Sequence, residues 1–213
     1  IQKKYNIYNN NIQFTGGSEK ITYMASLGNM AQNGMFKVGD DKFSRINARA
    51  NISAQVTDYL KLDVGNAFIN QKTDNPQDGG YSIDGGGNSI LRQFYSSRMR
   101  FPIYNEDGTY YRSGTSSAFG YALMKDGGFN DDLKRTYFNN VTATVNNLVK
   151  GLEVRLMYSR ESIDLQNRNF RRTVDYYSGP TAKSKTQLNN PNSYSITNYK
   201  TLKQNVQALV DYD

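Results

Sequence analysis

Apolar and polar residues alternate along several stretches of the chain, most clearly over residues 43–56. The apolar positions of this stretch are Ile46, Ala48, Ala50, Ile52, Ala54 and Val56. The polar positions between them are Asn47, Arg49, Asn51, Ser53 and Gln55. Because successive side chains leave opposite faces of a strand, the pattern predicts a strand with one apolar and one polar face.

The same alternation recurs along the chain and predicts about seven strands, near residues 8–15, 21–30, 43–56, 60–68, 141–145, 152–158 and 206–212. Most of them approach the 9–11 residues with which a tilted strand crosses a membrane. We therefore expect an all-β chain, an antiparallel arrangement of strands, and a possible membrane setting.

The connections between these strands alternate between short and long. The short ones are Gly16–Lys20, Thr57–Tyr59 and Val149–Gly151, and the long ones cover 31–42, 73–134 and 163–194. Short turns on one side and long loops on the other are typical of outer-membrane β-barrels. Loops above about 15 residues are uncommon in compact domains, which makes the order more informative than any single strand.

The longest connection, 73–134, carries signs of internal structure. Residues 89–99 show helical spacing that Pro102 ends, and Asn105–Gly108 has the composition of a turn. A second short helix is predicted over 118–125. We expect this loop to be folded and to serve as a lid or a docking surface.

Composition excludes a helical membrane protein and leaves a barrel open. Hydrophobic residues make up 37% of the chain, and the mean hydropathy is −0.73. No apolar run approaches the roughly 18 residues of a transmembrane helix. In a membrane barrel only alternate residues face lipid, so such an average is expected. The chain opens without a cleavable apolar leader, so any leader lies outside this sequence.

Charge and residue content also narrow the chemistry. The formal charge is +7, but Lys and Arg are spread without a tract, which favours a solvated surface over nucleic-acid binding. Cysteine and histidine are absent, which removes disulfides, thiolate sites and His-dependent triads. We expect no metal, no cofactor and no enzymatic activity.

The carboxylates do not form a convincing catalytic or metal-binding pattern. Glu106 and Asp107 are adjacent, but they lie in a predicted turn, where Asp is common for turn geometry alone. Asp74, Asp78 and Asp84 have the wrong spacing for a calcium loop of the helix–loop–helix type. A solvated, glycine-rich loop is favoured for that segment.

Candidate binding residues concentrate in the long loop. They are Tyr95, Arg98, Arg100, Tyr104, Tyr110 and Tyr111. The aromatic rings could serve as platforms for sugars or peptides, and the arginines could pair with carboxylates. The alternative is that these aromatic side chains pack the loop itself, which is the commoner role of such residues.

Several segments resemble the barrel of SusC/RagA-type TonB-dependent transporters. The resemblance spans nearly the whole chain, in the right order, through residues 14–28 (FTGGSEKITYMASLG), 45–52 (RINARANI), 56–62 (VTDYLKL), 73–76 (TDNP), 101–108 (FPIYNEDG) and 149–155 (VKGLEVR). It implies that residues 1–213 are part of one transmembrane β-barrel domain of 22 strands. Residues 73–134 would then be a long extracellular loop.

The resemblance also implies a cellular role. It implies import of oligosaccharides or peptides across the cell outer membrane, with a SusD-like lipoprotein over the extracellular mouth and energy from TonB. The plug, the N-terminal region that contacts TonB and the last barrel strand are not found in this sequence. In such a barrel, lipid contacts the apolar faces. The lumen-facing residues would be Asn47, Arg49, Asn51, Lys61, Asp63, Glu153 and Arg155.

A soluble β-sandwich that binds glycans or proteins, as an adhesin module does, is the alternative. It explains the alternation equally well, because one face would line a sandwich core. It explains the short–long order of the connections poorly. Small residues such as Ala48, Ala50 and Ala54 would also fill such a core poorly.

Overall fold

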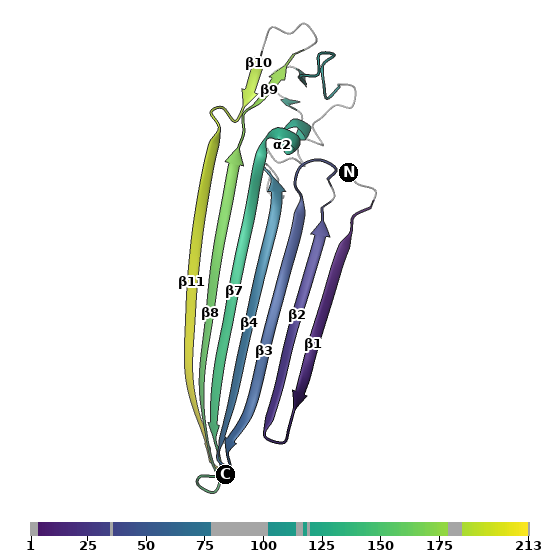
Figure 1. The fold of residues 1–213 in the computed structure, drawn as a ribbon. Helices are drawn as coiled ribbons and strands as arrows, with labels where there is room; N and C mark the ends of the chain where they lie inside the picture. The colour runs from purple at the N-terminus through teal and green to yellow at the C-terminus, as the bar shows by residue number, and fades with distance from the viewer. Residues whose placement is uncertain are drawn as a thin grey trace.

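The computed structural model describes residues 4–34, 36–77, 102–113, 117–118, 120–178 and 185–212. Its principal feature is one sheet of seven antiparallel strands, the main sheet, in which neighbours in space follow the order along the chain (Figure 1). The strands are β1 (Ile7–Gly17), β2 (Ile21–Asn33), β3 (Lys42–Thr57), β4 (Leu60–Pro76), β7 (Gly128–Val145), β8 (Leu152–Arg171) and β11 (Ser193–Tyr212). The predicted all-β chain with seven antiparallel strands is confirmed, and the sheet is open between β1 and β11.

The tight turns lie together at one end of the main sheet, which we call the turn end (Figure 1). In the β1–β2 turn, the Ser18 N–H donates to the Ile21 carbonyl at 2.6 Å. In the β7–β8 turn, the Leu152 N–H donates to the Val149 carbonyl at 3.1 Å. Gly151 has a φ of 80°, a conformation that glycine adopts without steric cost. The short connections are placed as predicted.

At the opposite end, the loop end, the strands are longer than predicted. β4 continues to Pro76 and β7 begins at Gly128, so the connection predicted over 73–134 is shorter on both sides. β8 likewise continues to Arg171, into the loop predicted over 163–194.

Polar side chains hold these extensions together. Asn167 of β8 donates to the Asp132 carboxylate of β7 at 2.9 Å. Arg168 of β8 forms an ion pair with Asp131 of β7 at 3.0 Å. Because both faces are polar here, hydrophobic alternation gives no sign that the strands continue.

A smaller sheet and one helix lie at the loop end, and we call them the cap (Figure 1). The order of its strands is β10 (Lys185–Leu188), β9 (Val174–Tyr177), β5 (Tyr110–Ser113) and β6 (Ser117–Ala118), and the helix is α2 (Gly120–Asp126). β5 and β9 run parallel, with Tyr110 opposite Tyr176. The cap therefore joins segments from two different connections of the main sheet.

Two predicted features of the long loop are confirmed. The turn is closed by the Asn105 N–H, which donates to the Thr109 carbonyl at 2.8 Å. The short helix predicted over 118–125 is α2, after which the Gly127 N–H donates to the Leu123 carbonyl at 2.8 Å. The helix predicted over 89–99 lies outside the described residues. Within them, no helix is long and apolar enough to cross a membrane.

The buried apolar side chains lie in the cap and beside it. One cluster consists of Ala122, Leu123, Val174 and Tyr176. A second consists of Phe36 and Met124. Among the described residues, no Ile, Leu, Val, Met, Phe or Tyr side chain of the main sheet is buried to a comparable degree. The main sheet therefore has no core of its own.

Candidate functional site

One face of the main sheet is apolar and exposed. The strand register places alternating residues of neighbouring strands side by side, with Leu27 opposite Ala48 and Ala48 opposite Phe68. The large exposed side chains of this apolar face include Ile12, Phe14, Tyr23, Leu27, Ile46, Ile52, Val141, Leu156, Val206 and Val210. Val206 is 76% exposed, so the described part of the chain does not cover it. A contiguous apolar surface of this extent marks a contact with another apolar phase or partner.

The other face, the polar face, carries all the residues that the sequence places in a lumen. These are Asn47, Arg49, Asn51, Lys61, Asp63, Glu153 and Arg155. Lys61 forms an ion pair with Asp63 at 3.3 Å, and Arg155 pairs with Glu153. These ion pairs join residues two apart on one strand, where side chains share a face.

The polar face is also the hollowed one. A hollow of about 670 Å³ is lined mostly from this face, including by Arg49, Asn51, Phe138, Asn140, Glu161 and Lys203. A second, of about 480 Å³, is lined by residues that include Thr22, Met24, Asn51, Ser53 and Asp63. A third, of about 240 Å³, is lined by Gln71, Thr73, Asp132, Lys134 and Leu165. The polar face is therefore the concave side of the sheet.

This distribution of polar and apolar side chains is the reverse of the one expected in a curved sheet of a water-soluble protein. A small soluble barrel fills its concave side with packed side chains. Here the concave side has charged and amide side chains, and Ile, Leu and Val point outward from the convex side. A polar interior with an apolar exterior is the pattern of barrels in membranes.

Phe138 lines the large hollow. It lies on the polar face, opposite Ala67 and Glu161, and its side chain is 41% exposed. The small side chain of Ala67 leaves room beside the ring. Its position on the polar face follows from counting two by two along β7, once the start of that strand is known.

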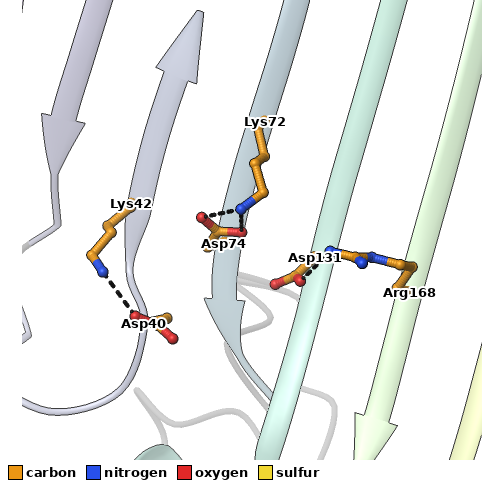
Figure 2. Close-up of polar contacts among 6 residues, drawn as sticks. All are labelled: Asp40, Lys42, Lys72, Asp74, Asp131 and Arg168. Carbon is orange, nitrogen blue, oxygen red and sulfur yellow. Dashed lines mark hydrogen bonds and ion pairs between the residues drawn. The ribbon is translucent and has the colours of Figure 1, made fainter.

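At the loop end, the apolar face becomes charged. Figure 2 shows Lys42 paired with Asp40 at 2.9 Å, Lys72 with Asp74 at 2.8 Å and Asp131 with Arg168 at 3.0 Å. Lys42, Asp74, Asp131 and Arg168 lie in one row across β3, β4, β7 and β8. The apolar surface therefore ends well before the strands do.

In the cap, four tyrosines form a cluster around α2 and β5. We call Tyr104, Tyr110, Tyr121 and Tyr176 the tyrosine cluster. The Tyr104 ring stacks on Tyr110 with 5.1 Å between centroids. Tyr121 meets Tyr104 edge-on at 6.0 Å, and Tyr176 meets Tyr110 at 6.0 Å. Such geometries add to the stability that burial alone provides.

The pKa values of Tyr104 and Tyr110 are shifted in opposite directions, and Lys125 and Asp126 of α2 contribute to these shifts. Hydrogen bonds from Tyr121 and Lys125 lower the pKa of Tyr104, and the Lys125 ammonium lies 3.2 Å from the Tyr104 hydroxyl. Tyr110 is partly buried and donates to the Asp126 carboxylate. Burial first, and then that carboxylate, raise the pKa of Tyr110. The cap thus presents a polarised hydroxyl on Tyr104 beside a cation, which suits a polar ligand.

The structure brings together only some of the predicted binding residues. Tyr104 and Tyr110 belong to the tyrosine cluster, and Tyr111 is partly buried in β5, where its N–H donates to the Ile103 carbonyl at 3.0 Å. Tyr95, Arg98 and Arg100 lie outside the described residues. Tyr121 and Lys125 were not predicted as site residues. Their spacing of four on one helix face is the sequence signal that could have found them.

No group of three or more His, Cys, Asp or Glu side chains able to hold a metal ion occurs within the described ranges. The chemistry that the arrangement offers is therefore binding by aromatic rings, amides and ion pairs. Two places offer such groups for binding, namely the hollow of the polar face and the tyrosine cluster.

Comparisons with known proteins found a curated relative and a solved structure that resemble parts of this chain. No family model matches the chain. A TonB-dependent receptor P26 of Formosa agariphila is 35% identical over 107 residues, which is 49% of this chain. That match covers 9% of the receptor, so this chain spans a small part of the relative's length.

A likeness in structure covers more of the chain. The RagAB peptide importer in its closed-closed state superposes with a TM-score of 0.58 at 14% sequence identity. The superposition covers 96% of this chain and 30% of that chain. At this level of identity the likeness concerns the fold. The main sheet and cap therefore share the fold of part of an importer chain.

Proposed function

We propose that this chain forms part of the wall of a TonB-dependent importer in a bacterial outer membrane. The observation that carries the proposal is the curvature of the main sheet, with charged and amide residues on the concave face and apolar residues on the convex one. In this arrangement lipid covers the convex face, and water or a plug fills the concave side. The likeness to a TonB-dependent receptor and to RagAB supports the same assignment.

The length of the apolar surface supports a membrane setting. On β3 the apolar positions extend from Ile46 to Ala54, about nine residues, and a tilted strand needs 9–11 to cross. Corresponding stretches, each with one polar residue on this face, extend from Tyr137 to Val145 on β7 (Asn139) and from Leu202 to Val210 on β11 (Gln204). The turn end would then face the periplasm and the loop end the exterior.

Closure of the barrel requires further strands. The edges at β1 and β11 carry unpaired backbone groups, which the bilayer does not tolerate. We therefore propose that the main sheet belongs to a larger barrel, of 22 strands by the family resemblance, with a plug in its lumen. Asn47, Arg49, Asn51, Lys61, Asp63, Glu153 and Arg155 would form part of the hydrated wall around that plug.

The cargo and partners follow from the same proposal. The cargo would be an oligosaccharide or a peptide, delivered under a SusD-like surface lipoprotein and drawn inward with energy from TonB. In the cap, Tyr104, Tyr110 and Tyr111 would contact cargo or partner, together with Tyr95, Arg98 and Arg100 of the same connection. The polarised hydroxyl of Tyr104 beside Lys125 is the observation that favours a polar cargo.

A soluble glycan-binding or protein-binding sandwich is the second candidate. It would need a second sheet packed over the apolar face. In the described part of the chain, the smaller sheet lies at the loop end instead (Figure 1). Ile52 and Val206 remain more than half exposed, which a sandwich core would not leave.

The test uses single cysteines along β3 in the full-length protein in intact outer membranes. The chain has no cysteine of its own, so each label reports one position. We expect Ile46→Cys and Ile52→Cys to react with a lipid-phase reagent, and Asn47→Cys and Asn51→Cys with a water-soluble one. Equal labelling of both faces by the water-soluble reagent, or absence of the protein from the membrane, would favour the soluble sandwich.

A further inference from the structure

A row of polar residues crosses the apolar face. Asn66 of β4, Asn139 of β7, Arg160 of β8 and Gln204 of β11 are paired neighbours, and we call them the polar row. The row towards the turn end is Val64, Val141, Tyr158 and Val206. The row towards the loop end is Phe68, Tyr137, Ser162 and Leu202. The polar row therefore lies inside the apolar surface and not at its edge.

Most of the polar row is satisfied within the sheet. The Asn139 amide donates to the Asn66 carbonyl oxygen at 2.6 Å. The Gln204 amide donates to the Tyr158 hydroxyl at 3.0 Å. Arg160 is exposed, and among the described residues it has neither an ion pair nor a side-chain hydrogen bond. A charged side chain on a lipid-facing position costs stability, and the cost rises with its depth in the bilayer.

The cost falls if the guanidinium reaches towards the loop end. Ser162 lies two residues further along β8, roughly 7 Å away. Its side chain is small, which leaves space for the guanidinium between Tyr137 and Leu202. Long cationic side chains extend in this manner towards a polar interface. The next row in that direction contains Arg135, Asp164 and Lys200 in register. Arg160 would therefore meet two more cations and one carboxylate.

These cations differ from those nearer the loop end. Lys72 and Arg168 each have a carboxylate partner (Figure 2). Arg135 and Lys200, in contrast, form no ion pair in the described part of the chain, although Asp164 lies between them in register. With Arg160 they leave an excess of positive charge where the apolar surface ends. We call Arg135, Arg160 and Lys200 the cation group.

We infer that the cation group binds the phosphate of an anionic lipid in the leaflet that surrounds the loop end. This inference rests on the proposed membrane setting. The apolar row of Tyr158 and Val206 would contact the acyl chains, and the cation group would meet the headgroup above them. Charge complementarity selects a phosphate-bearing lipid over a neutral one, since each cation near such a surface contributes a favourable electrostatic interaction.

The test measures lipid binding by the full-length protein in detergent. Diphosphoryl lipid A is titrated, and the amount retained per protein gives an apparent Kd. We expect Arg160→Ala to weaken retention roughly fivefold, and Arg135→Ala with Arg160→Ala and Lys200→Ala together to weaken it more. Lys150→Ala is the matched control, because Lys150 is an exposed cation in the β7–β8 turn at the opposite end of the main sheet, and its Kd should not change.

Further measurements separate the other possible occupants. Inorganic phosphate alone should not displace lipid A at millimolar concentration; if it does, the site binds free phosphate and the inference fails. Equal retention of dephosphorylated lipid A would also overturn it. Cross-linking of the wild type and Arg160→Ala tests a second copy, and loss of a dimer in the variant would assign the polar row to a protein interface instead.

The cysteine experiment keeps the two proposals apart. If the convex face labels from lipid but Arg160→Ala retains lipid A as the wild type does, only the lipid-phosphate inference fails. If the convex face labels from water, the membrane setting itself fails.

Discussion

The main sheet and the cap of this protein follow opposite packing rules. The cap buries Leu123 and Tyr176 almost completely, at 2% and 0% exposure. The main sheet leaves Ile52 and Val206 at 51% and 76% exposure on its convex side, with polar groups on its concave side. The cap buries its apolar side chains within itself, whereas the main sheet leaves those of its convex side uncovered by the described part of the chain.

The alternation of apolar and polar residues along a strand identifies the two faces of the sheet, but it does not show what covers each face. The same period of two describes a sandwich strand and a membrane strand. Curvature separates the two cases, because it shows which face is enclosed.

The largest effect is expected from a cavity in the cap. Leu123→Ala removes a buried side chain packed with Val174 and Tyr176, and such a change typically costs about 2–5 kcal/mol. Amide exchange should show the loss in β9 and α2, with little change in the main sheet. Leu148→Ala, at a 66% exposed turn residue, is the control and should be nearly neutral. Equal loss of protection in cap and sheet would mean that the two regions form one folding unit.

A charge on the convex face should have the next largest effect. Ile52→Arg places a guanidinium in the apolar stretch of β3 and should cost about 2–4 kcal/mol in lipid vesicles. Asn51→Arg, one residue away on the concave face, should cost much less. Urea unfolding of the full-length protein in vesicles measures both variants. Similar values for the two would remove the distinction between the faces.

A smaller effect is expected at the tyrosine cluster. Tyr110→Phe removes the hydroxyl that donates to Asp126 and should cost about 1–3 kcal/mol, because a partly buried carboxylate loses a donor. Spectroscopic titration of the wild type should show tyrosines that ionise above the ordinary range, because the pKa values of Tyr110 and Tyr121 are both raised, and the Tyr110 ionisation should be missing in this variant. Unchanged titration would mean that the contact with Asp126 does not form.

The smallest effect concerns acid sensitivity of the β9–β10 pair. A hydrogen bond and ion pair from Lys185, at 2.8 Å, together with Gln187, lower the pKa of Asp175. Because the folded pKa is lowered, the contribution is present above the ordinary pKa of 3.8 and is lost as the pH falls through the lower folded value. Amide exchange in β10 should accelerate in that window, and Asp175→Asn should abolish the dependence.

The sequence predicts the main sheet well where one face is apolar. Residues 43–56 and 206–212 alternate, and the strands predicted there are confirmed, β3 over nearly its whole length and β11 over its last seven residues. It does not predict the strand ends near the loop end, because stretches such as 166–169 (QNRN) are polar on both faces and gain their order from cross-strand pairs such as Asn167 with Asp132.

The candidate site likewise has features that the sequence predicts and features that it does not. The face of Asn51 and Arg155 follows from counting by two, so the polar face could be predicted. The concavity of that face could not, because it arises from the sheet as a whole. The tyrosine cluster depends on β5 pairing with β9, which brings Tyr110 beside Tyr176 from far along the chain. Local sequence contains no signal for such a contact.

The length of the strands has a consequence for how the protein meets its surroundings. β8 has 20 residues, and a membrane crossing needs 9–11, so about ten residues of strand, roughly 30 Å, remain beyond the bilayer. In the proposed setting the cap would stand on a rigid stalk above the lipid surface. An antibody or a phage tail fibre approaching the cell would meet the cap first, so immune or viral pressure would act on the cap and spare the sheet.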